Sequence, residues 1–163
     1  PSADPVIFGI FSHFETPLAA TYQGVGERAV EVAAEHVATR RSVKNQTTYS
    51  NDPDIRWRIA EAALIMNAVG PQIRELARDI DAGVDRGRSW MPQLSAAKNA
   101  AAEATLRAVE QAMRACGGSA YYNTHELSRL YRDALAGLFQ PSDQESLHAA
   151  WANLIMGPIE KAQ

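Results

Sequence analysis

Apolar and small residues recur at spacings of three and four along most of the chain, which is the periodicity of helices with one buried face. In the first segment, roughly residues 6–39, this face comprises Phe11, Phe14, Leu18, Tyr22, Val25, Ala29, Val32 and His36. Pro17 lacks an amide proton and crowds the preceding turn, so it should break the segment near residues 12–16. The pattern predicts a short helix followed by a long one.

The second periodic segment is the most regular. It follows a polar connection, residues 40–53, whose end is marked by the helix cap Asp52 and by Pro53 at a first helical position. Its stripe comprises Ile55, Ile59, Ala62, Met66, Val69, Ile73, Leu76 and Ile80. Alternating spacings of this kind are expected of a helix that packs nearly antiparallel to its neighbours, and Gly70-Pro71 should kink it.

A third helix is predicted from about Gln93 to Cys116, where two glycines end it. Its apolar stripe is rich in small residues: Ala102, Leu106, Val109, Met113 and Cys116. Small side chains favour a close approach of neighbouring helices. This segment should therefore lie inside the fold.

Two shorter helices complete the pattern. Asn123 and Glu126 have the spacing of a capping box, as do Ser142 and Glu145, so helices should begin after Asn123 and at Ser142. No strand pattern of convincing length is present. The sequence predicts an all-α fold, an up-and-down four-helix bundle with short additional terminal helices, formed by one domain over residues 1–163.

Composition narrows the possible partners. The net charge of −3 gives no basic footprint, which argues against nucleic acid as a partner. No apolar run approaches the ~20 residues of a membrane span, so no membrane association is expected. Cys116 is the only cysteine, which excludes an internal disulfide and favours a reducing, cytoplasmic location.

Local spacing gives little support for a metal site. None of the four histidines has another histidine or a cysteine one turn away, and Glu145-x-x-His148 occurs once where helical di-iron sites need two such motifs. We therefore predict no metal. Cys116 precedes a helix C-terminus, where the helix dipole disfavours a thiolate, so we expect a buried, inert thiol.

Two features could contact an anion. Gly117-Gly118, before a new helix, could present backbone donors to a phosphate, although a helix C-cap is the more frequent role of such a pair. Arg40-Arg41 follows the first long helix, where basic residues also complement the helix dipole. Spacing alone leaves both alternatives open.

The stretch from Cys116 to Ala134, CGGSAYYNTHELSRLYRDA, resembles the acyl-CoA dehydrogenase family. That family has a Gly-Gly turn, an aromatic residue and then a helix containing Leu-x-Arg-Asp-Ala or a close variant. The small-residue segment from Leu18 to Ala29, leading to Thr39-Arg40-Arg41, is also similar to the first helix of the family's C-terminal domain.

The resemblance implies a four-helix-bundle domain that follows an N-terminal helical domain and a middle β domain of the same polypeptide. It implies an FAD-dependent oxidoreductase acting on an acyl thioester and assembling as a dimer or tetramer. Arg40 or Arg41 would reach the flavin phosphates of a neighbouring subunit, and Gly117 and Gly118 would approach the cofactor with their backbone.

The chain departs from the family pattern where chemistry is expected. The family's catalytic glutamate, counted without gaps from Arg132-Asp133, falls on Pro141, which cannot abstract a proton. Glu145 lies one turn later, and His148 could act in a flavin-dependent monooxygenase of the same fold, which would use FMN. A non-catalytic helical assembly module is the third hypothesis.

Overall fold

The computed structural model describes residues 4–159 and contains no β-strand within that range. Five α-helices follow one another: α1 (Pro5–Thr39), α2 (Pro53–Asp81), α3 (Trp90–Cys116), α4 (Glu126–Ala136) and α5 (Gln144–Met156). Short 3-10 helices lie at Tyr49–Asn51, Gly87–Ser89 and Gly117–Tyr121. The predicted all-α bundle is confirmed. Within the described range, no helix is long and apolar enough to cross a membrane.

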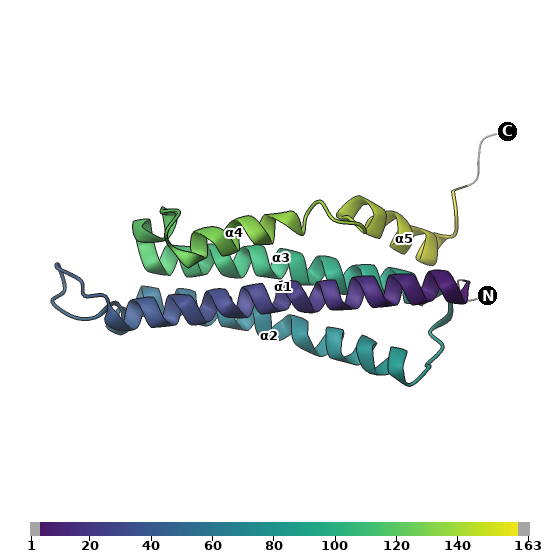
Figure 1. Ribbon diagram of the computed structural model, residues 1–163, viewed down its shortest axis with the longest axis horizontal. Helices are drawn as coiled ribbons and strands as arrows, with labels where there is room; N and C mark the ends of the chain where they lie inside the picture. The colour runs from purple at the N-terminus through teal and green to yellow at the C-terminus, as the bar shows by residue number, and fades with distance from the viewer. Residues whose placement is uncertain (1–3, 160–163) are drawn as a thin grey trace.

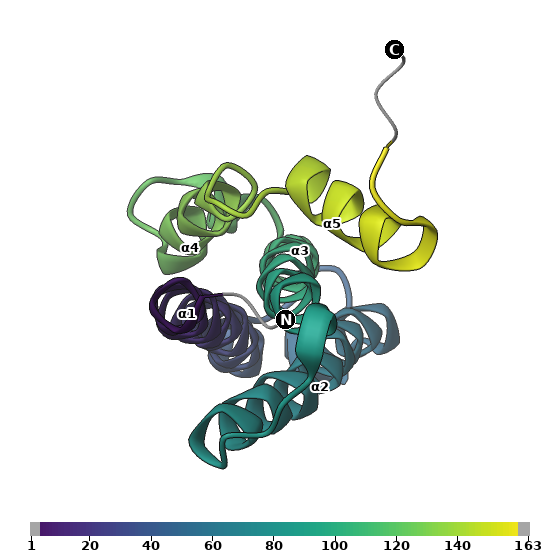
Figure 2. The same ribbon diagram turned by 90° about the vertical axis from the view of Figure 1, so that its right-hand side faces the viewer.

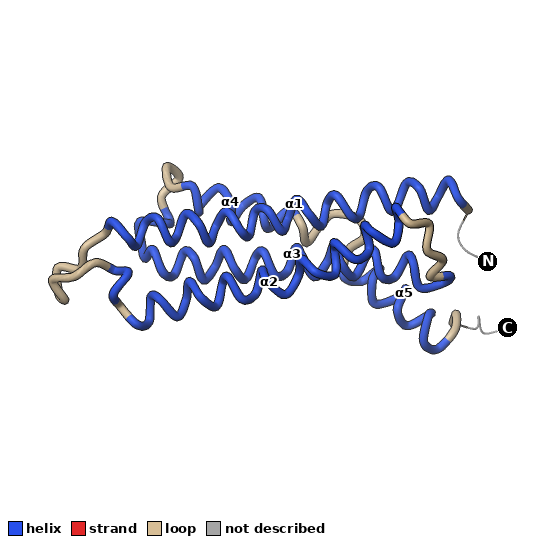
Figure 3. The backbone as a smooth tube through the Cα atoms, turned by 90° about the horizontal axis from the view of Figure 1, so that it is seen from below, coloured by secondary structure: helices blue, strands red, loops and turns tan. Residues whose placement is uncertain are grey.

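The helices form an elongated bundle in which α3 is central (Figures 1 and 2). Helices α1 and α2 run beside α3 over most of its length (Figures 1 and 3), and α4 and α5 follow one another above α3 in the view of Figure 1. Seen end-on, α4 lies on the flank of α3 near α1 and α5 lies on the opposite flank (Figure 2). The last part of α2 diverges from the bundle axis (Figure 1), and the helix runs without interruption through Gly70 and Pro71.

Small residues on α3 explain how the other helices come so close to it. Its fully or almost fully buried apolar positions are mostly alanines: Ala97, Ala101, Ala102, Ala104, Ala108, Ala112 and Ala115. Against them pack Tyr22 and Ala29 of α1, Met66 of α2 and Leu127 of α4. Alanine loses no side-chain entropy in a helix and allows short interaxial distances, so the sequence favours this central position.

The predicted break at Pro17 is wrong. Helix α1 runs without interruption through Pro17, whose ring lies on the solvent-exposed face. The flanking residues Glu15 and Ala19 are fully buried, so packing of the same helix on both sides of the proline holds it in place. A proline removes one helical hydrogen bond, a cost that tertiary contacts can exceed.

Two predicted helix caps are also wrong by one or two residues. His125, not Asn123, caps α4, because its Nδ1 accepts the amide proton of Leu127 at 3.2 Å. Asp143, not Ser142, caps α5, where its Oδ1 accepts from the amide of Ser146 at 2.9 Å. Capping boxes identify a helix start only within a few residues, since several polar side chains compete for the same amides.

Gly137 lies in close contact with both α1 and α3. A Cβ added there would lie 2.7 Å from Cβ of Ala102 and 2.9 Å from Cζ of Tyr22, and neither neighbour can rotate away. We expect Gly137→Ala to lower the free energy of unfolding by about 1–3 kcal/mol because it overpacks this contact. Urea unfolding of the 163-residue chain measures the change.

Gly24→Ala is the matched control, because a Cβ at Gly24 would meet no atom within 4 Å. Within helix α1 the same substitution should raise stability by about 0.5–1 kcal/mol through helix propensity. Equal effects of the two substitutions would contradict the close approach at Gly137.

Candidate functional site

The arginine at the end of α1 meets the Gly-Gly turn at the end of α3. Arg40 is the residue that caps α1, and its Nη1 donates to Oγ of Ser119 at 2.7 Å. Ser119 directly follows Gly117 and Gly118, so residues far apart in the sequence lie together at one end of the bundle (Figure 1). Three of the four predicted cofactor contacts, Arg40, Gly117 and Gly118, thus lie together at this end of the bundle.

Arg40 is held in place without a counter-ion among residues 4–159. Its guanidinium lies over the ring of Tyr49 at 5.2 Å, and its Nη1 is 3.3 Å from Nε2 of His36. No carboxylate of the described residues lies within ion-pair distance of it, whereas Arg28 and Arg86 each have acidic partners. A half-buried, pre-positioned guanidinium with free donors is suited to binding an anion such as a phosphate.

The backbone of the Gly-Gly turn is accessible. Gly117 ends α3 with φ of 71°, a conformation that favours glycine, and both glycines are exposed. A Cβ added at Gly117 or Gly118 would meet no atom within 4 Å. A ligand can therefore approach this backbone closely, beside the donors of Arg40 and Ser119.

Arg41 is differently placed. Its side chain is exposed and its Nη2 donates to the carbonyl of Gln46 at 3.0 Å, within the loop that follows α1. The same loop is closed by a backbone pairing of Arg41 with Thr48. Of the two arginines that the sequence left as alternatives, Arg40 is the one that faces the Gly-Gly turn.

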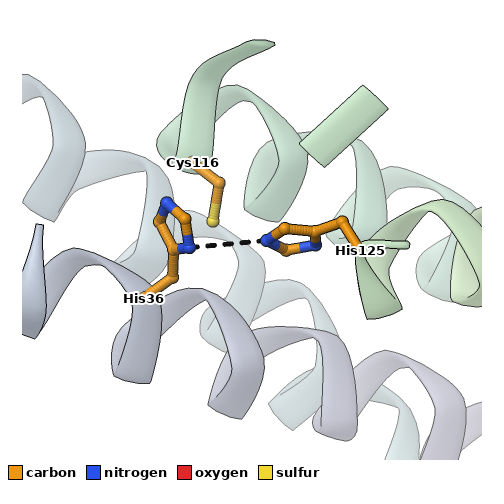
Figure 4. A group of neighbouring side chains, drawn as sticks. All are labelled: His36, Cys116 and His125. Atoms are coloured by element: carbon orange, nitrogen blue, oxygen red, sulfur yellow. Dashed lines mark hydrogen bonds between the residues drawn. The ribbon is translucent and has the colours of Figure 1, made fainter. Parts of the chain in front are cut away.

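Next to Arg40, two histidines and the cysteine converge. Nε2 of His125 is 3.4 Å from Nδ1 of His36, and the thiol of Cys116 points toward the space between the two rings (Figure 4). One potential ligand atom from each residue lies within 4.8 Å of the others. The spacing of histidines within one helix could not predict this cluster, because its members come from α1, α3 and the cap of α4.

Burial disfavours charge on this cluster. It raises the pKa of the Cys116 thiol to about 11, a shift that the nearby Arg40 opposes. It also lowers the pKa of His36, and the neighbouring His125 and Arg40 lower it further. The predicted buried thiol is confirmed, and the lowered pKa of His36 favours its neutral ring as a hydrogen-bonding group.

A second polar cluster lies inside the bundle, where the connection between α4 and α5 crosses it. Nζ of Lys98, fully buried on α3, donates to the carbonyls of Gly137, Gln140 and Ser142 at 2.9, 2.8 and 3.2 Å. Oε1 of Glu15, fully buried on α1, accepts the amide proton of Ser142 at 3.1 Å. These bonds tie the connection to both long helices.

One atom of this cluster lacks a partner. Oε2 of Glu15 is a buried polar atom without a hydrogen bond in the described structure. Burial raises the pKa of Glu15, while the bond from Ser142 and the charge of Lys98 act in the opposite direction. Neither Glu15 nor Lys98 was predicted from the sequence. Their spacing could have indicated burial, because they lie four positions before Ala19 and Ala102 on buried helical faces.

The weak catalytic candidates on α5 lie elsewhere. Glu145 and His148 are both exposed, and Nδ1 of His148 is 2.7 Å from the carbonyl of Gln144 in its own helix. Helix α5 lies toward the end of the bundle opposite the Gly-Gly turn (Figure 1). Among the described residues, no hydrogen bond or ion pair joins either of them to Arg40, Glu15 or Ser142.

Comparison with known proteins gives consistent matches. The family described as acyl-CoA dehydrogenase, C-terminal domain, matches residues 5–139. The YdbM protein of Bacillus subtilis (strain 168), which carries an acyl-CoA dehydrogenase name, is 30% identical over 122 residues, or 75% of this chain and 32% of its own. The chain thus spans about a third of the length of this curated relative.

Solved structures show the same fold. Butyryl-CoA dehydrogenase from Megasphaera elsdenii matches with a TM-score of 0.82 at 17% identity, over 91% of this chain and 37% of its own. PigA, solved as an FAD complex, matches with a TM-score of 0.79 at 17% identity, over 95% of this chain and 39% of its own. At these identities the similarity establishes the fold.

The buried carboxyl of Glu15 gives a pH-dependent prediction. Its pKa is raised in the folded chain, so its contribution to stability is fully present below about pH 4.5 and is lost as pH rises through the folded-state pKa. Glu15→Gln cannot ionise. The unfolding free energy of the wild type minus that of this variant should therefore fall as pH rises from 4 to 8, measured by urea unfolding.

Glu126→Gln provides a control of opposite sign. Arg28 donates to both oxygens of Glu126 at 3.1 Å and lowers its pKa, so this contribution is present above about pH 4.5 and is lost as pH falls. The corresponding difference in unfolding free energy should rise with pH below about pH 4.5 and stay nearly level above it. If both variants gave the same slope, the assignment of a raised pKa to Glu15 would be wrong.

Proposed function

The chain belongs to the acyl-CoA dehydrogenase family, and we propose on that premise that it is the C-terminal helical domain of a larger FAD-dependent oxidoreductase. In that protein it would contribute cofactor contacts and part of a subunit interface. The N-terminal helical and middle β domains implied by the resemblance would belong to the same polypeptide. The length of the matched relative, of which this chain spans 32%, supports the proposal.

The observation that carries the proposal is the convergence of Arg40 with the Gly-Gly turn. A dinucleotide presents phosphate oxygens, for which a guanidinium without a carboxylate partner and accessible backbone donors are suitable ligands. We propose that Arg40, Ser119 and the backbone of Gly117 and Gly118 hold these phosphates. When bound, a flavin supplies two-electron redox chemistry. The FAD complex of PigA is consistent with this choice of cofactor.

The length of α1 supports the proposed self-association. Glu15 and Arg40 lie about 37 Å apart along one continuous helix, at 1.5 Å per residue. We propose that Arg40 contacts the flavin of a neighbouring subunit, while Glu15 serves the active site of its own. Several large apolar side chains are exposed in the isolated chain and would be buried against other subunits of a dimer or tetramer, or against the other domains. They are Val6, Ile7, Ile10, Trp57, Leu64, Ile155 and Met156.

We further propose that Glu15 is the proton acceptor of a dehydrogenation of an acyl thioester. Its carboxylate meets the amide of Ser142, the residue next to Pro141, on which the family's catalytic glutamate falls. A carboxylate from α1 would therefore reach the same place by a different route. A general base needs an oxygen that no other donor occupies, and Oε2 of Glu15 has no hydrogen-bond partner. The raised pKa of Glu15 also makes its carboxylate a stronger base.

Cofactor binding is tested in the full-length protein. Arg40→Ala should reduce the retention of FAD by about tenfold or more, because a charge-assisted hydrogen bond contributes about 1.5–3 kcal/mol. Arg41→Ala should have a smaller effect, since Arg41 is engaged in its own loop. Flavin absorbance after gel filtration measures retention.

The control is Arg78→Ala, an exposed arginine near the end of α2 whose Nε donates to the carbonyl of Arg74. It should leave flavin content unchanged. Equal retention by the Arg40 and Arg78 variants would overturn the proposed phosphate contact. A full-length wild type that binds no flavin, yet forms a stable oligomer, would favour the assembly-module hypothesis.

The catalytic role of Glu15 is tested with the same protein. Glu15→Gln should lower the rate of acyl-CoA oxidation with an artificial electron acceptor by about 10²–10⁴-fold without loss of flavin. It should also remove the acidic limb of the pH profile, because a general base acts only when it is deprotonated. Glu103→Gln, on the exposed face of α3, is the matched control and should leave the rate unchanged.

Two results would contradict this assignment. One is a normal rate in the Glu15 variant together with a loss in Glu145→Gln or His148→Ala, which would move the chemistry to α5. The other is oxygen uptake with added reduced FMN and no acyl-CoA oxidation by the wild type, which would identify a flavin-dependent monooxygenase. Cytoplasmic location remains part of the proposal, supported by the single buried thiol.

A further inference from the structure

We propose that His36, Cys116 and His125 form a binding site for a divalent transition-metal ion of the zinc type. The three residues project from α1, the last turn of α3 and the N-cap of α4 (Figure 4). This site is independent of the proposed flavin contacts in its chemistry, because its donors are two imidazoles and a thiol. It can therefore be tested in the 163-residue chain without any cofactor.

The spacing of the donor atoms fits a tetrahedral ion. Zinc–nitrogen bonds of about 2.0–2.1 Å place two coordinating nitrogens roughly 3.3–3.4 Å apart. Nδ1 of His36 and Nε2 of His125 are 3.4 Å apart. The ligand atoms of all three residues lie within 4.8 Å of one another, so the thiol would have to approach the nitrogens by about an ångström to reach a zinc–sulfur distance near 2.3 Å.

The donor types select the class of metal. One thiol and two imidazoles are ligands for zinc and related borderline ions, whereas calcium and magnesium take oxygen ligands. Three protein ligands leave a fourth position for water or another small ligand. Cys116 is fully buried and both histidines are partly buried, so the ion would lie near the base of the Gly-Gly turn and be shielded on the α3 side.

Metal binding requires one proton to move within His125 and one to leave Cys116. In the hydrogen-bonded arrangement, Nε2–H of His125 donates to Nδ1 of His36, because Nδ1 of His125 accepts the amide proton of Leu127. An ion bound at Nδ1 of His36 and Nε2 of His125 requires the proton of His125 to move to Nδ1. The thiol of Cys116 releases its proton to solvent. The amide of Leu127 then loses its acceptor, a small cost beside metal coordination.

Existing contacts supply an outer shell. A metal-bound His36 carries its proton on Nε2, and Oγ of Ser119 lies 3.4 Å from that nitrogen and can accept it. Arg40 keeps its shorter bond to Ser119, at 2.7 Å. Its positive charge opposes a nearby cation, while the thiolate formed on binding compensates part of that charge. A bound ion would thus fix Ser119 and Arg40, the same side chains proposed to meet the flavin phosphates.

The test uses cobalt as a spectroscopic substitute for zinc. The purified chain is treated with a chelator and titrated with Co²⁺, and thiolate ligation is read as a sulfur-to-cobalt charge-transfer band. We expect one ion per chain, a band that Zn²⁺ removes by competition, and a higher melting temperature with Zn²⁺. A chain that shows neither band nor stabilisation would overturn the proposal.

Substitutions distinguish metal binding at this site from nonspecific metal binding by other histidines. His125→Asn removes one ligand but keeps a residue that caps helices well, so α4 should still form. The double variant His125→Asn/Cys116→Ala should weaken Zn²⁺ binding by about 100-fold or more. Cys116→Ala alone should abolish the sulfur-to-cobalt charge-transfer band. The double variant His13→Ala/His148→Ala removes the two exposed histidines outside the cluster and should bind normally. Binding lost in this control but kept in the cluster variants would overturn the proposal.

Discussion

Close packing around the alanine-rich face of α3 is the constraint on which the rest of this molecule depends. Every other helix except α5 contributes to core clusters with α3, and the contact distances are set by alanines and by Gly137. Larger side chains would separate α1 from α3 and move Arg40 away from Ser119. The end of the bundle that carries the candidate cofactor contacts is therefore positioned by small residues in its interior.

Charge buried in this interior needs compensation, and the fold supplies it through the backbone. The ammonium of Lys98 is satisfied by three carbonyls of the connection between α4 and α5, while Glu15 holds the amide of Ser142. A buried ammonium without such partners would be strongly destabilising. The connection is consequently fixed in position, and the carboxylate of Glu15 from another helix lies beside it.

Much of the fold could be predicted from the sequence, because amphipathic periodicity is a local property. The stripes of α2 and α3 are buried largely as their spacing indicates, with Ala62, Met66 and Val109 in the core. Local rules failed where tertiary contacts compete with them. Pro17 does not break α1, since buried neighbours hold both sides of it, and the caps of α4 and α5 are His125 and Asp143 instead of the residues the capping boxes indicated.

By itself the sequence determined the helical class, the order of the segments, the burial of the single thiol and the family resemblance carried by the Gly-Gly and Arg-Asp stretch. Only the tertiary structure decided which residues meet. It placed Arg40 and not Arg41 at the Gly-Gly turn, brought His36 to His125 and Cys116, and aimed Glu15 at Ser142. The physical reason is that periodicity specifies which face of a helix is buried, whereas the partner of that face depends on the packing of segments distant in the sequence.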